Sequence, residues 1–153
     1  MNIVIIGSGG REHALCYKLL KSSKINKIYC IPGNAGTDEI ATNIFADIND
    51  FDEIYKIVLK LNVELIVVGP EIPLVNGIVD YFEKKNIKIF GPNKKCSQLE
   101  GSKFFMKNIC KKYNIPSAKY FEISDINKIE KFLSSVSFPV VVKSDGLAAG
   151  KGV

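Results

Sequence analysis

Short β-branched runs that end at glycine or proline constrain this chain more than any other feature. The first run, Ile3–Ile6, stops at Gly7 and is followed by a helical pattern over residues 11–22. A continuous apolar run of this kind is typical of a strand buried on both faces, as in a parallel sheet. The same alternation of strand and helix continues to residue 92. It predicts an α/β fold, a Rossmann-like parallel sheet with helices on both faces.

The spacing of apolar residues predicts the remaining elements of this first region. Apolar residues that are continuous or alternate with polar ones predict strands, and apolar residues three and four apart predict helices. We expect strands at Lys27–Ile31, Ile44–Ala46, Glu64–Val68 and Lys88–Phe90, and helices at Phe51–Leu61 and residues 74–85.

The pattern changes after residue 92. Ser102 is expected to cap a helix that runs to about Tyr113. We then expect an extended segment at Tyr120–Ile123, a helix opened by Ser124 or Asp125, and a strand at Pro139–Val142. With the boundary placed in the region 113–119, the prediction is a first domain at residues 1–118 and an incomplete second domain at residues 119–153.

Composition restricts the class of protein. The chain has 153 residues, of which 46% are hydrophobic and 24% charged, the balance of a soluble globular protein. No apolar run approaches the roughly 18–20 residues needed to cross a bilayer. The run Ile3–Ile6 is also too short for the core of a signal peptide. We therefore expect a cytoplasmic protein with no membrane partner.

The cysteines exclude one kind of site. None of the four lies in a C-x-x-C pair or a Cys/His cluster, which excludes a structural zinc site on spacing. A disulfide framework is not expected either, because a chain of this length can build a core without one.

Charge is unevenly distributed along the chain. Residues 1–76 hold 7 basic and 9 acidic side chains, whereas residues 77–153 hold 14 and 7. Residues 94–112 are rich in lysine. These lysines can attract polyanions, or they can form a solvated face, which is more in keeping with a chain that is lysine-rich throughout. This stretch contains no arginine, so nucleic acid is not an expected partner. Arg11 is the one arginine among 21 basic residues, which points to a need for its planar fork of donors.

Four unusual segments follow the predicted strands. In a parallel sheet the carboxyl ends of all strands lie at one edge, where ligands bind. We expect the four segments to meet at that edge: Gly7–His13, Pro32–Gly36, Gly69–Leu74 and Gly91–Asn93.

The first of these segments has the composition of an anion-binding turn. A dinucleotide-binding turn needs a third small residue where this chain has Glu12, so an NAD-dependent oxidoreductase is disfavoured. Glycines still allow close approach of an anion, and a helix start favours negative charge. Gly9, Gly10 and Arg11 together suit a single phosphate monoester.

Two further segments carry possible ligands. Glu71, held between two prolines, can accept hydrogen bonds from sugar hydroxyls or can be a solvated carboxylate. Asn34 in the second loop could add a contact. The segment Lys143–Val153 is not a Walker A loop, but its small residues and lysine could fold over phosphates or form a simple turn.

Five motifs, in order along the whole chain, resemble those of the phosphoribosylamine–glycine ligase (glycinamide ribonucleotide synthetase) family. They are Gly7–Ala14, Pro32–Thr37, Gly69–Val75, Leu99–Lys103 and Asp145–Val153.

This resemblance implies a fold, a reaction and a set of ligands. The fold is a Rossmann-like domain followed by an ATP-grasp domain, here the incomplete residues 119–153. The implied reaction of purine synthesis joins glycine to 5-phosphoribosylamine through a glycyl phosphate, with ATP and Mg²⁺ or Mn²⁺. Gly9, Gly10, Arg11, Asn34 and Glu71 would bind phosphoribosylamine; Lys103, Lys143, Gly150, Lys151 and Gly152 would bind ATP.

Other parts of the expected enzyme have no counterpart in this sequence. Family members are several hundred residues long, so the metal ligands are expected outside the chain, and no catalytic residue is identified. The chain alone is expected to be inactive. The alternative that stays open is a non-catalytic module that binds a phosphosugar or a nucleotide.

Overall fold

The computed structural model describes residues 1–148. The chain forms two compact units, Met1–Ser97 and Gln98–Val153, and each is described by itself. The domain boundary at residue 118 stays a prediction. No helix in the described part of the chain is long and apolar enough to cross a membrane.

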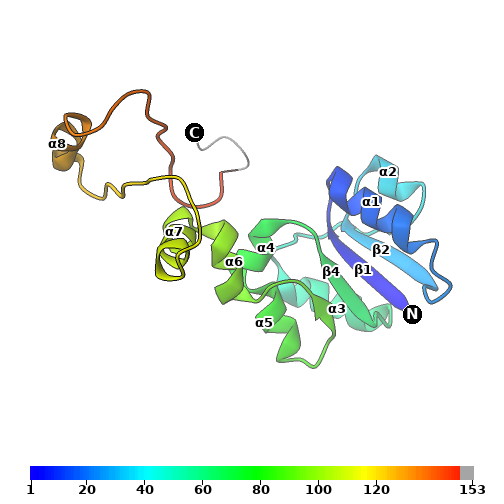
Figure 1. The fold of residues 1–153 in the computed structure, drawn as a ribbon. Helices are drawn as coiled ribbons and strands as arrows, with labels where there is room; N and C mark the ends of the chain where they lie inside the picture. The colour runs from blue at the N-terminus through cyan, green and yellow to red at the C-terminus, as the bar shows by residue number, and fades with distance from the viewer. Residues whose placement is uncertain (149–153) are drawn as a thin grey trace. The chain divides into compact units, whose positions relative to one another are not determined.

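The first unit is built on a five-stranded parallel sheet with the strand order β3-β2-β1-β4-β5 (Figure 1). The central strand β1 (Asn2–Gly7) pairs along its whole length with β2 and on its other side with β4. The outer pairings are also parallel, so the expected fold class is confirmed. The other strands are β2 (Lys27–Pro32), β3 (Thr42–Asn43), β4 (Leu65–Val68) and β5 (Ile89–Phe90).

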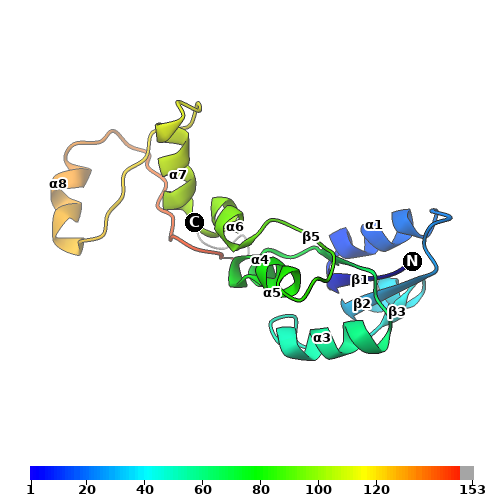
Figure 2. The ribbon, with the colours of Figure 1, turned by 90° about the horizontal axis from the view of Figure 1, so that it is seen from below.

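Helices cover both faces of this sheet, as Figure 2 shows for α1 and α3 on opposite sides. On one face, Ile3 and Ile5 pack with Cys16 of α1 (Gly10–Leu19). On the other face, Val4 and Ile6 pack against α3 (Phe51–Lys60) and α5 (Ile78–Glu83). Because side chains alternate between the faces of a strand, helices on both faces explain the unbroken apolar run of β1.

The ends of the helices use side chains that favour such positions. Asp50 caps α3 by accepting a hydrogen bond from the Glu53 N–H at 2.9 Å. Just beyond α3, α5 and α7 (Lys103–Lys112), an asparagine adopts a positive φ, the role that glycine more often fills. These three residues are Asn62, Asn86 and Asn114.

Two predicted elements of the first unit differ from the structure. The third strand is Thr42–Asn43 and not Ile44–Ala46, because its register is set by pairing with Tyr29 and Cys30 rather than by an apolar run. The helix predicted over residues 74–85 is two helices, α4 (Glu71–Asn76) and α5, separated by Gly77. Gly77 has a φ of 97°, which a continuous helix does not allow.

Two helices were not predicted. The short α2 (Ala35–Asp38) lies inside the second loop, where glycine and proline pointed to an irregular turn. The other is α6 (Lys94–Gly101), within the lysine-rich stretch.

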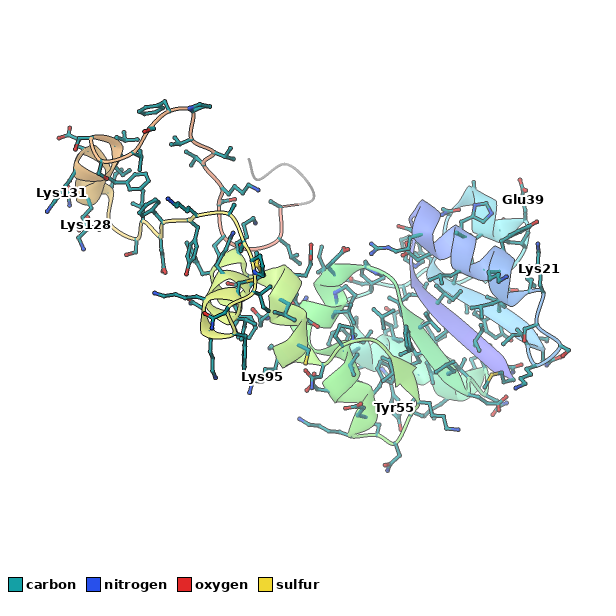
Figure 3. All side chains as sticks on the ribbon, in the orientation of Figure 1. Lys21, Glu39, Tyr55, Lys95, Lys128 and Lys131 are labelled. Atoms are coloured by element: carbon teal, nitrogen blue, oxygen red, sulfur yellow. The ribbon has the colours of Figure 1, made fainter. Side chains whose placement is uncertain are left out.

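Figure 3 shows the side chains, including those of the first unit, where Lys21 and Glu39 lie at the outside and Tyr55 belongs to α3.

The second unit contains α7 and a short helical segment. Ser102 caps α7 as predicted, because its Oγ accepts a hydrogen bond from the Phe105 N–H at 3.1 Å. Asp125 opens the 3₁₀ turn η1 (Ile126–Lys128), which leads into α8 (Ile129–Leu133), close to the predicted helix.

The strand predicted at Pro139–Val142 is wrong. A strand needs a neighbour to satisfy its backbone groups, and in residues 1–148 all strands belong to the sheet of the first unit. The extended segment at Tyr120–Ile123 has no helix or strand structure either.

Candidate functional site

The order of the strands places a switch point between β1 and β4. From β1 the chain builds outward through β2 to β3, whereas β4 and β5 add on the other side of β1. The loops that leave β1 and β4 therefore diverge, and ligands of open α/β sheets bind beyond the carboxyl ends of the strands at such a point. The loop after β1 carries Arg11, and the loop after β4 carries Glu71.

These two residues meet. Arg11 Nη1 donates a hydrogen bond to Glu71 Oε1 at 3.0 Å, although both side chains are partly exposed, Arg11 at 58% and Glu71 at 40%. The hydrogen bond from Arg11 lowers the pKa of Glu71, helped by a backbone N–H bond. The two residues predicted to hold a phosphate and a sugar thus share one position at the carboxyl edge.

Asn34 joins the second loop to the first. Its Nδ2 donates to the carbonyl oxygens of Ser8 at 2.8 Å and Gly9 at 3.3 Å. Its Oδ1 accepts the Thr37 N–H at 2.9 Å and so caps α2. Because both ends of the amide are engaged within the protein, Asn34 fixes the relative position of two loops.

A buried polar group supports this junction. Thr37 is fully buried and donates from Oγ1 to Asn43 Oδ1 at 2.8 Å. Asn43 in turn donates to the Asn34 carbonyl at 2.8 Å. Sequence reasoning missed both Thr37 and Asn43; the position of Thr37 three residues after an N-cap was the signal available.

The remaining loops lie against the same edge. A Cβ placed on Gly91 would lie 2.7 Å from Leu74 Cδ2, so the fourth loop touches the start of the helix pair that follows β4. A Cβ on Gly36 would lie 2.6 Å from the ring of His13, which therefore packs against the second loop. Each of the four loops thus contacts a neighbouring loop at the carboxyl edge.

Glu12 is the residue of this edge that the sequence interpretation left without a role. It is only 3% exposed, and its Oε2 accepts the Gly9 N–H at 2.6 Å. Its Oε1 lies 3.4 Å from Arg11 Nε, within ion-pair distance, but accepts no hydrogen bond from the described residues. The signal for it was the absence of a third small residue in the glycine turn.

The residues assigned to ATP lie in the second unit. Lys103 Nζ donates to the Gly146 carbonyl at 2.8 Å, and its backbone N–H donates to Asp145 Oδ1 at 2.6 Å. Asp145 also accepts a hydrogen bond from Ser102 Oγ at 3.0 Å. The carboxylate of Asp145 thus occupies the start of α7. Lys143 is exposed, and Gly150, Lys151 and Gly152 lie outside the described residues.

Desolvation of the Asp145 carboxyl group opposes ionisation, but the hydrogen bonds from Ser102, Lys103 and Phe104 outweigh it and lower the pKa. The lysine-rich stretch is partly engaged in the same way. Lys103 is bound to Gly146, and Lys107 donates to the Ala118 carbonyl at 2.9 Å. These contacts give Lys103 and Lys107 backbone partners within the second unit.

Metal ligands are not gathered in the part of the chain that the structure describes. No group of three or more His, Cys, Asp or Glu side chains there could hold a metal ion. Cys16 and Cys30 do lie together in the core, with their Sγ atoms 3.1 Å apart. Burial raises the pKa of both thiols, that of Cys30 to about 12.

Comparison with protein families shows the class to which this chain belongs. A family model described as phosphoribosylglycinamide synthetase, N domain, matches residues 1–100, and that of the ATP-grasp (A) domain of the same synthetase matches residues 101–153. The chain belongs to the phosphoribosylglycinamide synthetase family, as its motifs indicated.

Individual relatives belong to the same family. A phosphoribosylamine–glycine ligase of Caldanaerobacter subterraneus is 44% identical over 153 residues, which are all of this chain and 37% of that protein. The crystal structure of the same ligase from Thermotoga maritima is 33% identical with a TM-score of 0.76, covering 99% of this chain and 35% of that one. This chain therefore spans little more than a third of the length of these relatives.

A more distant structure shares the fold. The biotin carboxylase domain of 2-oxoglutarate carboxylase from Hydrogenobacter thermophilus has a TM-score of 0.76 at 17% identity, covering 97% of this chain and 36% of that one. That protein was crystallised with MgADP and bicarbonate. At this identity the likeness concerns the fold alone.

Proposed function

We propose that residues 1–97 form the phosphoribosylamine site of an ATP-dependent ligase that joins glycine to 5-phosphoribosylamine. The observation that carries the proposal is the contact between Arg11 and Glu71, because it places a guanidinium and a carboxylate together at the switch point of the sheet. Family membership and relatives named as this ligase support the reaction.

The chemistry of the two groups fits a sugar phosphate. A guanidinium binds phosphate oxygens through parallel donors, and Gly10 opens α1, where backbone N–H groups favour an anion. Glu71 can accept hydrogen bonds from ribose hydroxyls while it stays bound to Arg11, because that contact uses only Oε1 of the carboxylate. Asn34 acts on this site by holding the second loop against the first.

The second unit contributes to the ATP site in this proposal. Lys103 and Lys143 are the described residues that fit it, since two lysines can neutralise phosphate charge. A divalent cation, Mg²⁺ or Mn²⁺, would supply charge neutralisation during phosphoryl transfer. Gly150, Lys151 and Gly152 complete the assignment as the resemblance implies. The substrates are phosphoribosylamine, glycine and ATP.

Titration calorimetry with ribose 5-phosphate tests the sugar-phosphate site. We expect Arg11→Ala to weaken binding at least tenfold, because a hydrogen bond to a charged group contributes about 1.5–3 kcal/mol. Lys24→Ala is the matched control, because Lys24 precedes β2 at the opposite edge of the sheet and its loss removes the same charge. Equal affinity of wild type and Arg11→Ala would contradict the proposal.

A further inference from the structure

We propose that Glu12 is the positioning and specificity residue of the sugar-phosphate site. Its buried carboxyl group fixes the glycine turn and Arg11 for a single phosphate, and it excludes the pyrophosphate of a dinucleotide from that turn. The inference rests on the proposed function, and it assigns a role to a residue that touches no substrate.

The first support is the location of the carboxyl group. Glu12 is 3% exposed and lies beneath the turn between β1 and α1, where Oε2 accepts the Gly9 N–H at 2.6 Å. This bond is half of a capping arrangement, in which the side chain at the third helical position bonds the N-cap backbone. It fixes the backbone at which α1 begins.

The second support is the set of glycines around it. A Cβ on Gly7 would lie 2.7 Å from Glu12 Cδ, a Cβ on Gly9 2.9 Å from Oε2, and a Cβ on Gly69 2.6 Å from Cδ. Real Cβ atoms are not found at such distances from other heavy atoms. These three glycines, at the end of β1 and in the loops after β1 and β4, therefore leave room for this carboxyl group. Gly10 alone of the turn has open space around it.

The third support is the hold on Arg11. Oε1 of Glu12 lies 3.4 Å from Nε, and Oε1 of Glu71 accepts from Nη1 at 3.0 Å. A guanidinium contacted on two different nitrogens has a fixed plane and direction. Glu12 is buried and adjacent in the chain, so it orients Arg11 whether or not Glu71 releases it to a ligand.

The same carboxyl group acts against a dinucleotide. In dinucleotide-binding turns of the form G-x-G-x-x-G/A, the pyrophosphate approaches the backbone N–H groups at the helix start. Here Gly7 and Gly9 match the first two glycines, and Glu12 stands at the third. It engages one of those N–H groups and places a carboxyl group under the turn, whereas a terminal phosphate can bind farther out, at Arg11.

A double-mutant cycle tests the positioning role. Ribose 5-phosphate affinity is measured by calorimetry for wild type, Glu12→Gln, Arg11→Ala and the double variant, with Glu53→Gln on the exposed surface of α3 as the charge-matched control. We expect Arg11→Ala to cost at least tenfold in wild type and less than twofold in the Glu12→Gln background. A purely structural role would leave the two effects multiplicative, which would overturn the inference.

A second variant tests the specificity role. Glu12→Ala converts the turn into a G-x-G-x-x-A sequence, so we expect it to bind NADH, detected by fluorescence quenching, at least tenfold more tightly than wild type does. Unchanged NADH affinity in folded Glu12→Ala would refute the exclusion of dinucleotides.

Hydrogen exchange tests the geometry without a variant. The Gly9 amide of wild type should be protected from exchange, because it donates to a buried acceptor. Exchange at the rate of an exposed amide would refute the geometry.

Different results would contradict the two proposals. If Arg11→Ala leaves wild-type binding unchanged, the phosphate site itself is wrong and this inference falls with it. If Arg11→Ala weakens binding but the cycle is multiplicative, only the role of Glu12 is wrong.

Discussion

Arg11 Nη1 lies 3.0 Å from Glu71 Oε1, although 60 positions of sequence separate the two residues. The contact joins the loops on the two sides of the switch point. It also ties the charge of Glu71 to the presence of Arg11.

The first prediction concerns the titration of Glu71. The hydrogen bond from Arg11 lowers the pKa of Glu71 in the folded protein. The pair therefore stabilises the fold at pH values above the unfolded pKa of Glu71, and this contribution is lost as pH falls through the lower folded value. Carboxyl ¹³C NMR should find the pKa of Glu71 below its usual range in wild type and closer to it in Arg11→Ala. The same pKa in both proteins would contradict the contact.

The second prediction compares two glycines. Gly69→Ala should destabilise the protein by about 1–3 kcal/mol, because its Cβ would overlap the Glu12 carboxyl group. Gly10→Ala, with open space around it in the first turn of α1, should be neutral or stabilising by up to about 1 kcal/mol. Urea unfolding followed by circular dichroism measures both. Adding Glu12→Ala to Gly69→Ala should restore part of the loss, and an additive double variant would show that the two positions do not touch.

The third prediction separates the two roles of Asn34. Asn34→Ala removes both the cap of α2 and the bonds to the first loop, and should cost about 1–2 kcal/mol. Asn34→Ser keeps a capping oxygen but lacks the amide N–H that donates to the Ser8 carbonyl. We expect the stability of Asn34→Ser to lie between those of wild type and Asn34→Ala. Its affinity for ribose 5-phosphate should be as low as that of Asn34→Ala. Wild-type affinity in Asn34→Ser would show that the link between the loops has no effect on binding.

The fourth prediction concerns Asp145 in the second unit. Hydrogen bonds from Ser102 and the first amides of α7 lower its pKa against the effect of desolvation. The contact is therefore present above the unfolded pKa of Asp145 and lost as pH falls through the lower folded value. The Lys103 amide resonance should shift with a midpoint below the usual range for aspartate. This transition should vanish in Asp145→Asn and persist in Asp38→Asn, a matched change at an exposed position of α2. A Lys103 amide that does not respond to pH would contradict the cap.

The fifth prediction uses the cysteines. Cys16 and Cys30 are buried and have raised pKa values, whereas Cys96 is exposed and Cys110 is partly exposed. A thiol reacts as its thiolate and only when accessible. An aromatic disulfide reagent at pH 8 should therefore label Cys96 and then Cys110 in the native protein, and all four cysteines in urea. Native labelling of Cys16 or Cys30, located by mass spectrometry, would contradict the packing of α1 on the sheet.

The sequence predicted those features whose cause is local. The apolar run of β1 and the caps at Asp125 and Ser102 depend on neighbours in the chain, and they appear as expected. The meeting of the loops was also predictable, because a parallel sheet brings its carboxyl ends together whatever its side chains are.

Features that depend on distant partners could not be predicted. The register of β3 is set by β2, and the strand expected at Pro139–Val142 has no partner in the described residues. The burial of the Glu12 side chain depends on the space beside Gly69, which lies 57 positions farther along the chain. A charged side chain in the first turn of a helix is usually solvated, so only the structure reveals its burial.

The central position of β1 has a consequence for synthesis on the ribosome. When the first 64 residues have emerged, β1 can pair with β2, but the strand for its other side has not been made. An unpaired, strongly apolar edge is prone to pair with other chains. This edge of β1 thus stays open to pairing with other chains until Leu65–Val68 has been made. The loop that carries Glu71 follows directly after that strand.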